Sequence, residues 1–548
     1  MSTRRRLWRA ELLLSVVALG ALGGVLLGGE LVQANESLRA WADGRFAAAL
    51  GWCAFTCLLY FLAVFVANGL LLFFAAAESA MRKRQRSSED FEALEASRFT
   101  IPVSIMSPIY NEELDAVASI RTLLEQDYPE FELIVVDDGS TDGTFERLDE
   151  AFALEEVEIF FRRIFHTEPL VGVFRSHAEP RLTVVRKRNG GKADALNCAL
   201  NFARYQYVLC VDGDTMYRRE ALLLGMRLAM RDPARIVGVT SMVALSFHPE
   251  GMHAQPSGRR SLDRSPFSVF QHLDYLRAFL GSRLGWSHLR FMLCSVGAFS
   301  IWRRDILEEL GGFSRAFSCE DIELTFRVHE RFLREGRAYE VLCMPETVGA
   351  TEAPSSVRSL VRQRARWQRA IMETLVAYRR MFGNPRYGRV GMLGLPFYVL
   401  SELLAPLFEL LSLLTLVLAV WTGAVSWELF AVVLGLLAFS NATLTSAAVL
   451  FDDWTARDYR SESVLRMMIA GPFDLFLYRP LIMIARLYGV WGFLRGRRDW
   501  DKFARNPRSE TSPARIRFSA TAGLGDRGQS EQAHGNRRKA AFCRAAER

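Results

Sequence analysis

Carboxylates occur in three short motifs whose spacing suits metal-assisted and acid–base chemistry. In chain order, the motifs are Asp137-Asp138, Asp212-Gly213-Asp214 and Glu320-Asp321. Two carboxylates one residue apart at the end of a strand can share Mg²⁺ or Mn²⁺, which take oxygen ligands from carboxylates, phosphates and water. We therefore expect Asp212 and Asp214 to hold a divalent ion that also binds the diphosphate of a nucleotide, with a solvated turn as the competing interpretation.

The other two acidic motifs each allow a functional and an ordinary structural interpretation. Glu320-Asp321 opens an amphipathic helix predicted over 322–332, and first-turn carboxylates are common partners of the helix dipole. The functional alternative makes Asp321 a general base that removes a proton from an acceptor hydroxyl. Asp137-Asp138 follows a β-branched run, where it either forms a turn or accepts hydrogen bonds from a uracil or a ribose.

Two basic motifs could bind the phosphates and the sugar. The loop 186–192 precedes a predicted helix, so its backbone amides and Lys192 could hold a diphosphate, although a basic surface turn explains it as well. Helical spacing puts Gln363, Arg366 and Trp367 on one face. The first two can donate to phosphate oxygens and the tryptophan ring can stack on a sugar. An arginine-rich interfacial helix with a tryptophan anchor is the alternative.

The segments that must position these residues are predicted to form alternating strands and helices. Strands are predicted at 101–107, 131–136, 182–185 and 207–211, and helices at 114–126 and 193–205. This alternation predicts an α/β fold with a doubly wound sheet, whose ligands lie beyond the carboxyl ends of the strands, where the aspartates stand. A basic, aromatic insertion at 155–180 interrupts the alternation, and 246–264 reads as a polar loop.

Apolar segments flank this middle block and are long enough to cross a bilayer, which needs about 20 residues. Predicted spans are Leu12–Leu31, Phe46–Ala77, Leu403–Trp421 and Leu429–Phe451. The segment Val464–Leu494 carries Asp474, Arg479 and Arg486, so we interpret it as interfacial or re-entrant rather than as a plain span.

The arrangement of positive charge predicts the topology. Three arginines at 4–6 predict a cytoplasmic N-terminus, or alternatively the first region of a cleaved signal peptide. Under both interpretations the block from about 98 to 390 is cytoplasmic, after a charged linker at 87–97.

The excess of basic residues lies in the C-terminal tail. The chain has 68 Lys and Arg and 61 Asp and Glu, a net charge of +7. The tail is predicted to be disordered and to face lipid. A nucleic-acid-binding arm is the competing interpretation, but the tail lacks interleaved aromatic residues, so no nucleic-acid partner is expected. The eight cysteines show no metal-binding spacing, which favours reduced structural thiols.

Taken together, these motifs resemble glycosyltransferase family 2, and most closely its membrane-embedded, processive branch. That branch includes poly-N-acetylglucosamine, hyaluronan, chitin and cellulose synthases. The resemblance covers roughly residues 98–495, and further similar stretches are Asn189–Asn197, Gly297–Phe299 with Arg303–Asp305, and Gly311–Phe313.

The resemblance implies a domain organisation and an activity. The expected parts are two N-terminal transmembrane helices (1–85), a cytoplasmic GT-A nucleotide-sugar-binding domain (98–355), amphipathic interface helices (356–390), C-terminal transmembrane and interfacial helices (391–495) and a basic tail (499–548). The implied reaction is inverting transfer from a UDP-sugar, for which UDP-N-acetylglucosamine is the best candidate, to a β-linked polysaccharide. The implied location is a bacterial inner membrane, with an accessory membrane subunit as a possible partner.

The resemblance also assigns roles to residues by position. Asp321 would be the catalytic base with Glu320 beside it, Trp367 would stack the acceptor, and Asp212 and Asp214 would bind a metal ion, Mg²⁺ or Mn²⁺. The implied nucleotide-sugar contacts are Asn111, Glu112, Asp137, Asp138, Lys192, Asp212, Gln363 and Arg366.

The sequence departs from the family pattern in two places and leaves alternative activities open. Cys319 stands where many relatives have threonine, and the charged segment Val464–Leu494 leaves the number of spans open. A non-processive transferase acting on a membrane lipid is the alternative enzyme. A catalytically silent membrane subunit or sugar-binding partner is the alternative from another class.

Overall fold

The computed structural model describes residues 36–86, 100–246, 265–354, 356–422, 427–456 and 461–496. Several predicted features lie outside these residues. They are the span at 12–31 with its signal-peptide alternative, the charged linker at 87–97, nearly all of the polar loop at 246–264, and the basic tail at 499–548.

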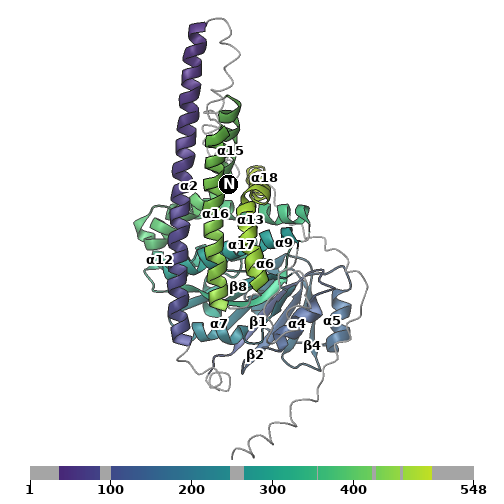
Figure 1. The fold of residues 1–548 in the computed structure, drawn as a ribbon. Coiled ribbons are helices and arrows are strands. Elements are labelled where there is room, and N and C mark those ends of the chain that lie inside the picture. The colour runs from purple at the N-terminus through teal and green to yellow at the C-terminus, as the bar shows by residue number, and fades with distance from the viewer. Residues whose placement is uncertain are drawn as a thin grey trace, which may run out of the picture. The chain divides into compact units, whose positions relative to one another are not determined.

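A ten-stranded mixed sheet forms the centre of the middle block (Figure 1). The order of its strands is β3-β4-β5-β2-β1-β6-β9-β8-β10-β7. Their bounds are β1 Val103–Ile109, β2 Phe131–Asp137, β3 Leu154–Glu156, β4 Leu170–Ser176, β5 Leu182–Lys187, β6 Tyr207–Val211, β7 Thr215–Tyr217, β8 Ile236–Ser246, β9 Phe299–Arg303 and β10 Glu340–Glu352.

The four predicted strands form a continuous parallel part of this sheet, in the order β5-β2-β1-β6, and β8 and β10 form a second parallel pair. Ile109 pairs with Asp137 at the carboxyl ends of β1 and β2. The doubly wound prediction is therefore confirmed for these strands. The acidic motifs consequently lie at one edge of the sheet, because parallel strands end on the same side.

The remaining strands were not predicted and make the sheet mixed. The segment predicted as an insertion at 155–180 instead contributes β4, which pairs antiparallel with β5 and carries β3 at the edge. On the other side β9 pairs antiparallel with both β6 and β8. Because β9 begins immediately after Gly297-Ala298, it brings that segment next to the end of β6.

Helices cover both faces of the sheet. Successive side chains of β2 point to opposite faces and therefore enter two different cores. Leu133 and Val135 pack into one core together with α4 (Ala116–Leu124), α5 (Thr144–Phe152) and α7 (Ala221–Ala229). Ile134 and Val136 pack into the other with α6 (Lys192–Phe202), α11 (Arg304–Glu309) and α12 (Glu320–Glu335).

A further group of helices and turns lies beside α12. It contains α9 (Pro266–Leu276), the π-helical turn η2 (Arg277–Arg283), α10 (Leu284–His288), α13 (Val357–Ala377) and the 3₁₀ turns η3 (Arg379–Met381) and η4 (Pro385–Tyr387). Of these, α13 and η4 contact α12. Helix α13 begins with a capping box in which Ser356 and Ser359 bond each other's backbone N–H groups. Residues 356–390 are thus largely helical, and their placement at a membrane interface stays a prediction.

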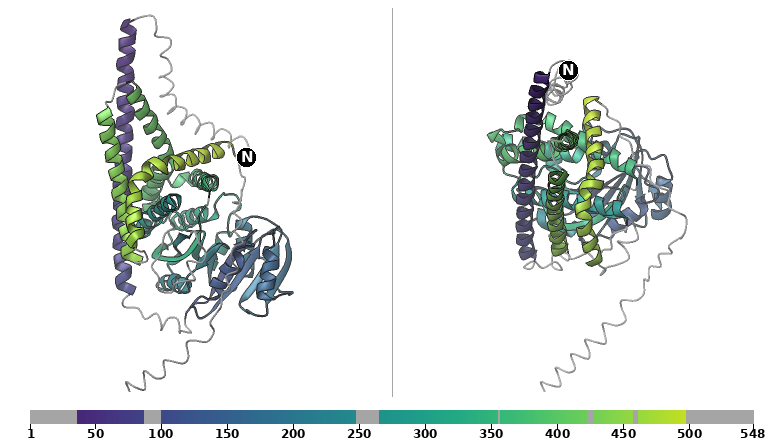
Figure 2. Two further views of the ribbon diagram at one scale, coloured as in Figure 1. Left: turned by 45° about the vertical axis from the view of Figure 1, so that its right-hand side comes forward. Right: turned by 45° about the horizontal axis from the view of Figure 1, so that its top comes forward.

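The long helix α2 (Glu36–Arg86) contains the predicted span at 46–77, and its part Gly44–Arg82 is long and apolar enough to cross a membrane. It runs beside α15 (Ala405–Trp421) and α16 (Trp427–Ala456) (Figure 2). Tyr60 stacks on Phe408 with ring centroids 4.0 Å apart. By length and composition, α2 is the one single helix among the described residues that could span a membrane.

Two bent helix pairs would raise the number of spans to three if each pair is one span. The first joins Val390–Leu403 to Ala405–Trp421 at 45°, through the π-helical turns η5 (Val390–Gly394) and η6 (Val399–Leu403) and the short helix α14 (Leu395–Tyr398). The predicted straight span Leu403–Trp421 is therefore one arm of a bent pair. The predicted span 429–451 is helical within α16 but is not among these candidates.

The second bent pair joins α17 (Ser461–Leu477) to α18 (Arg479–Leu494) with a bend of 51°. Three of its charged side chains form ion pairs with one another or with other helices. Asp474 is fully buried and lies 2.7 Å from Arg277 and 3.4 Å from Arg479. Arg486 lies 2.7 Å from Glu402. These ion pairs explain how charges are tolerated in an apolar segment, and the bend agrees with the prediction that this segment is not a plain span.

Candidate functional site

A cluster of charged side chains lies where β6 ends and where α6 and α12 begin. Its centre is Lys192, the first residue of α6, whose Nζ lies 2.6 Å from Oδ1 of Asp212 and 3.1 Å from Oε1 of Glu320. The fold therefore brings Glu320 to Lys192 and Asp212, from which the sequence separates it by more than a hundred positions. Burial alone would lower the pKa of Lys192, but the carboxylates of Asp212, Glu320 and Asp321 hold that pKa well above its usual value.

Asp321 lies beside this cluster in the first turn of α12. Its Oδ2 accepts a hydrogen bond of 3.0 Å from the backbone N–H of Gly297, and its Oδ1 accepts one of 2.8 Å from Ile322. Burial, reinforced by the negative charge of Glu320, raises the pKa of Asp321 to about 6, although Lys192 acts in the opposite direction. Asp321 is therefore ionised near neutral pH and basic enough to take up a proton.

Gly297 makes the close approach in this cluster possible. A Cβ at this position would lie 3.0 Å from Nζ of Lys192 and 3.1 Å from Oδ2 of Asp321. The segment Gly297–Phe299 was singled out in the sequence only as a resemblance, and the structure shows that it holds the carboxylate of Asp321.

The Asp212-Gly213-Asp214 turn is also tightly packed. A Cβ at Gly213 would lie 2.4 Å from Cγ2 of Ile109, so only glycine allows the turn to pass over β1. The backbone N–H of Asp212 donates to the hydroxyl of Tyr217 at 3.1 Å. Asp214 accepts hydrogen bonds from Thr215 at 3.3 Å and from Thr351, at the end of β10, at 3.5 Å.

The two aspartates suit a metal ion that takes most of its ligands from a substrate. Both carboxylates are partly exposed at the end of β6. Within the described residues, no group of three or more His, Cys, Asp or Glu side chains gathers as a preformed metal site. Mg²⁺ typically uses one or two carboxylates and completes its shell with phosphate oxygens and water, so this donor set fits such an ion.

Asp138 and Asp137 point into the protein. Asp138 is 2% exposed, accepts hydrogen bonds from Gly190 at 3.0 Å and Gly191 at 2.7 Å, and pairs with Lys187. Asp137 is fully buried and accepts a bond of 2.9 Å from the backbone N–H of Ser140. Asp138 thus fixes the loop before α6, and contact of these residues with a base stays a prediction.

Asn111 and Glu112 shape the neighbouring turn after β1. Asn111 has a left-handed backbone (φ 53°), and its side-chain oxygen accepts a hydrogen bond of 2.8 Å from the N–H of Thr141. The N–H of Glu112 donates to the hydroxyl of Thr144 at 2.8 Å. These bonds hold the ends of β1 and β2 together beside the acidic cluster.

A buried ion network supports the same loops and was not predicted. Lys187, fully buried, lies 2.7 Å from Asp194, and Asp194 lies 3.1 Å from Arg315. Arg315 in turn lies 3.0 Å from Glu168 in the segment before β4. A lysine that ends a strand soon after the apolar Val184 and Val185 was the available signal, since a buried charge requires a partner.

Gln363, Arg366 and Trp367 lie together in α13, as the spacing predicts. Helix α13 packs on α12, and the charge of Arg366 acts on the thiol of Cys319, the residue before Glu320. The ring of Trp367 lies 6.1 Å from that of Tyr275. One face of the tryptophan is therefore occupied, because the guanidinium of Arg364 lies 4.4 Å from its centroid.

A clamp between α13 and α12, also missed by sequence reasoning, fixes the position of Asp321. Both oxygens of Glu373 bind Ser318, at 2.7 Å to its backbone N–H and 3.0 Å to its hydroxyl. One turn further on, the hydroxyl of Tyr378 donates to Glu323 at 2.6 Å.

The described cysteines are free, as predicted, and buried Cys198, Cys210, Cys294 and Cys343 lie in the middle block. Burial raises the pKa of Cys294 to about 11 and that of Cys343 to about 12. These thiols are therefore protonated and structural.

Comparisons with known proteins add to this geometry. Residues 104–311 match the family described as glycosyl transferase family 2. A poly-beta-1,6-N-acetyl-D-glucosamine synthase of Staphylococcus epidermidis is 22% identical over 319 residues, which cover 58% of this chain and 64% of the relative. The enzyme of the same name from Staphylococcus aureus (strain COL) is 23% identical over 322 residues, with the same coverage.

Two solved structures are also similar. A mannosyltransferase from Pyrobaculum calidifontis in complex with GDP-Man and Mn²⁺ is 20% identical with a TM-score of 0.44, over 76% of this chain and 98% of that one. Staphylococcus aureus TarS 1–349 in complex with UDP-GlcNAc is 15% identical with a TM-score of 0.32, over 72% and 93% of the two chains. The chain spans 64% of the length of the first curated relative.

Proposed function

Because residues 104–311 form a glycosyl transferase family 2 domain, we propose that this protein transfers sugar from UDP-N-acetylglucosamine to a growing β-linked polysaccharide, with inversion at the anomeric carbon. The names of its relatives support the donor and the product. The observation that carries the proposal is the meeting of Asp321, Lys192 and Asp212 at the ends of β6, α6 and α12.

In the proposed reaction, Asp321 removes the proton from the acceptor hydroxyl as that oxygen attacks the sugar. Its raised pKa makes it a stronger base than an exposed aspartate while leaving it ionised at neutral pH. The two backbone N–H groups that bind it hold the carboxylate in position. Glu373 of α13 holds Ser318, in the segment that leads into α12.

The donor diphosphate would lie between the acidic turn and the N-terminus of α6 in a GT-A arrangement. Asp212 and Asp214 would hold Mg²⁺ or Mn²⁺, and the ion would neutralise charge on the departing UDP. Lys192 supplies a fixed positive charge beside the same position, and the helix N-terminus adds backbone N–H groups. Gln363 and Arg366 would approach the diphosphate from α13.

Membrane attachment and processive synthesis complete the proposal. Support comes from α2, which is long and apolar enough to span a bilayer, and from α13, which joins the site to the bent pair that begins at Val390. We place the acidic cluster on the cytoplasmic side. In this arrangement the polysaccharide leaves the site toward the apolar helices, and Trp367 would contact it.

The test uses purified full-length protein with UDP-N-acetylglucosamine and Mg²⁺, and measures both UDP release and product length. Long β-linked chains support the proposal. A single sugar on an organic-extractable lipid would instead favour the lipid-glycosylating alternative. Absence of turnover with a panel of UDP-sugars would favour the interpretation of a catalytically silent membrane subunit. The Asp321→Asn protein is the negative control.

A further inference from the structure

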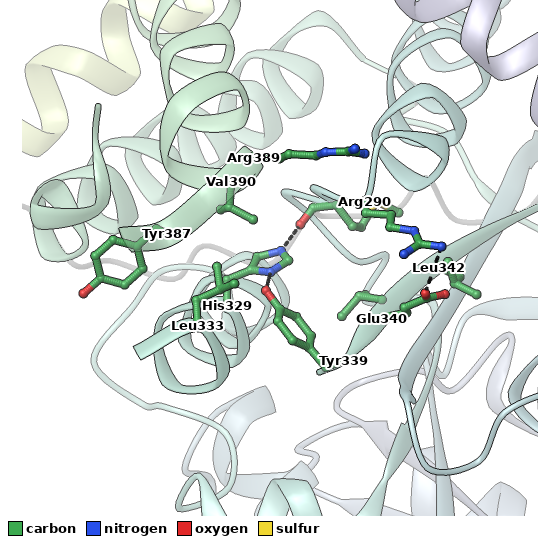
Figure 3. A pocket seen from close by; sticks show the side chains of 11 residues that line it. Arg290, His329, Leu333, Tyr339, Glu340, Leu342, Tyr387, Arg389 and Val390 are labelled. Atoms are coloured by element: carbon green, nitrogen blue, oxygen red, sulfur yellow. Dashed lines mark hydrogen bonds and ion pairs between the residues drawn. The ribbon is translucent and has the colours of Figure 1, made fainter. Parts of the chain in front are cut away.

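A cavity lies beside the C-terminal half of α12, whereas Asp321 lies in its first turn. It has a volume of about 140 Å³ and is lined by residues from α12, β10 and the turns on either side of them (Figure 3). His329 follows Asp321 by eight positions, which corresponds to about 12 Å along a helix. The cavity is therefore separate from the acidic cluster, and the proposed transferase reaction makes no use of it.

The walls of this cavity combine an apolar interior with arginines. Leu333, Val341 and Val390 contribute apolar surface. Arg290 and Arg389 lie on one side in Figure 3. The buried imidazole of His329 carries no charge at neutral pH, because burial lowers its pKa to about 4. Such a combination suits an amphiphile with an anionic head.

Glu340 is the only carboxylate among the lining residues, and it is already paired. It lies 3.4 Å from Arg290 and 3.4 Å from Arg235. Two guanidinium groups share this one carboxylate, and Arg389 adds a third positive charge. Arg389 donates to the carbonyl of Leu289 at 3.4 Å, which leaves its other N–H groups available for an anion.

Arg290 occupies a backbone position where glycine is usual. It has φ 60° directly after α10, and helices commonly end with glycine in this left-handed conformation. An arginine with 60% of its side chain exposed is held there despite that conformational preference. A positively charged, largely exposed side chain is thereby held among the residues that line the cavity.

The chain beside the cavity is basic and borders apolar surface. Residues 374–401 contain four arginines, Arg379, Arg380, Arg386 and Arg389, and no acidic residue. All four are exposed, and so are Met392 at 46% and Leu393 at 53%. Charge and apolar exposure therefore occur side by side, as they do in segments that bind anionic membrane surfaces.

The cavity lies where two candidate spans meet the sheet domain. Val390, which lines it, is the first residue of the bent pair that ends at Trp421. On the other side, His288 lies two residues before Arg290 and bonds Glu78 of α2 at 2.9 Å. Both candidate spans thus approach the domain next to the cavity.

We propose that this cavity binds the headgroup of an anionic phospholipid, with Arg290 and Arg389 on its phosphate and the acyl chains directed along Met392 and Leu393. The proposal rests on the membrane placement proposed above and not on sugar transfer. A failure of turnover and a failure of lipid binding are therefore distinguishable.

The test is native mass spectrometry of the full-length protein in detergent, titrated with phosphatidylglycerol or phosphatidylcholine. Each arginine at a membrane surface contributes about fivefold to the affinity for anionic lipid. The Arg290→Gln/Arg389→Gln protein should therefore bind phosphatidylglycerol about twenty-five-fold more weakly. The charge-matched control is Arg121→Gln/Arg231→Gln, at exposed positions next to the opposite core, which should bind as the unchanged protein does.

Three results would overturn the proposal. They are equal affinity for phosphatidylglycerol and phosphatidylcholine, equal loss of affinity in the control variant, and competition by glycerol 3-phosphate as strong as that by the lipid. The last result would assign the cavity to a soluble anion. If the double variant does not fold, the single Arg389→Gln protein should still show a loss of about fivefold, and unchanged affinity there counts against the proposal.

Discussion

Replacement of Asp321 by asparagine separates a catalytic role from a structural one, because the two roles predict opposite changes in stability. If Asp321 is the base, Asp321→Asn should lower turnover at least about a hundredfold. The same change removes a buried negative charge. Since burial raises the pKa of Asp321 from 3.8 to about 6, its ionised form is disfavoured in the folded protein.

The size of this effect follows from the pKa difference. The pKa of Asp321 is about two units higher in the folded protein, and each pKa unit corresponds to about 1.36 kcal/mol. The free energy of unfolding is therefore lower by roughly 3 kcal/mol when the carboxyl is ionised. The loss develops as the pH rises from about 4 to about 6 and is complete above that range. Asparagine has one acceptor oxygen for the two N–H donors at Gly297 and Ile322. The variant therefore loses one hydrogen bond, which reduces its gain in stability by about 1 kcal/mol. A net gain of about 2 kcal/mol is expected at pH 8.

The assay combines turnover and thermal unfolding across pH 4.5 to 8.5. In the unchanged protein, about a tenth of the Asp321 side chains are ionised at pH 5 and nearly all at pH 8, so kcat/KM should fall about tenfold between these pH values. At pH 8 the Asp321→Asn protein should unfold at a higher temperature. The difference should shrink below pH 5. The control is Glu330→Gln on the same helix, whose partner Arg334 lies near the surface.

The reasoning is refuted if Asp321→Asn retains turnover within a few fold of the unchanged protein. A protein that is inactive and also less stable at pH 8 would show instead that Asp321 supports the structure of α12. A value of kcat/KM that does not fall as the pH is lowered from 7 to 5 would contradict the raised pKa of Asp321.

Three further predictions follow from neighbouring contacts. Glu320→Gln should move the acidic limb of kcat/KM to lower pH, because Glu320 helps to raise the pKa of the base; a limb that moves upward or stays in place would contradict this. Asp214→Ala should abolish Mg²⁺-dependent UDP release while circular dichroism stays unchanged, whereas retained metal dependence would exclude it as a ligand. Gly489→Ala should lower the unfolding temperature, since a Cβ there would lie 2.5 Å from the carbonyl oxygen of Ala365 in α13. Gly492→Ala should not lower the unfolding temperature, because open space surrounds Gly492. Equal effects of the two changes would count against close packing of α13 on α18.

Much of the site's location could be predicted from the sequence. Apolar β-branched runs that end in acidic turns predicted four parallel strands, and all four are present. The strands β8, β9 and β10 were missed although each of them follows one helix and precedes another. Their pairing depends on the side chains of the finished sheet rather than on local sequence.

The partners of the charged residues could not be predicted in the same way. The sequence singled out Lys192, Asp212 and Glu320, yet nothing in their spacing shows that one lysine contacts both carboxylates. Similarly, Asp138 was predicted to contact the nucleotide-sugar. In the structure, its carboxylate binds Lys187 and the loop before α6. Such pairings join residues far apart in the chain, so they depend on how the loops pack over the strand ends.

The sequence by itself determined which residue types stand at the ends of the strands, because hydrophobic periodicity and turn chemistry are local. It also predicted the apolar segment 46–77, which lies in a helix long and apolar enough to cross a membrane. Only the tertiary structure decided the ionisation of the base, the close approach of Gly297 and the cavity beside Arg290. These depend on burial and on distances between separate elements, and the free energy of a buried charge changes steeply with both.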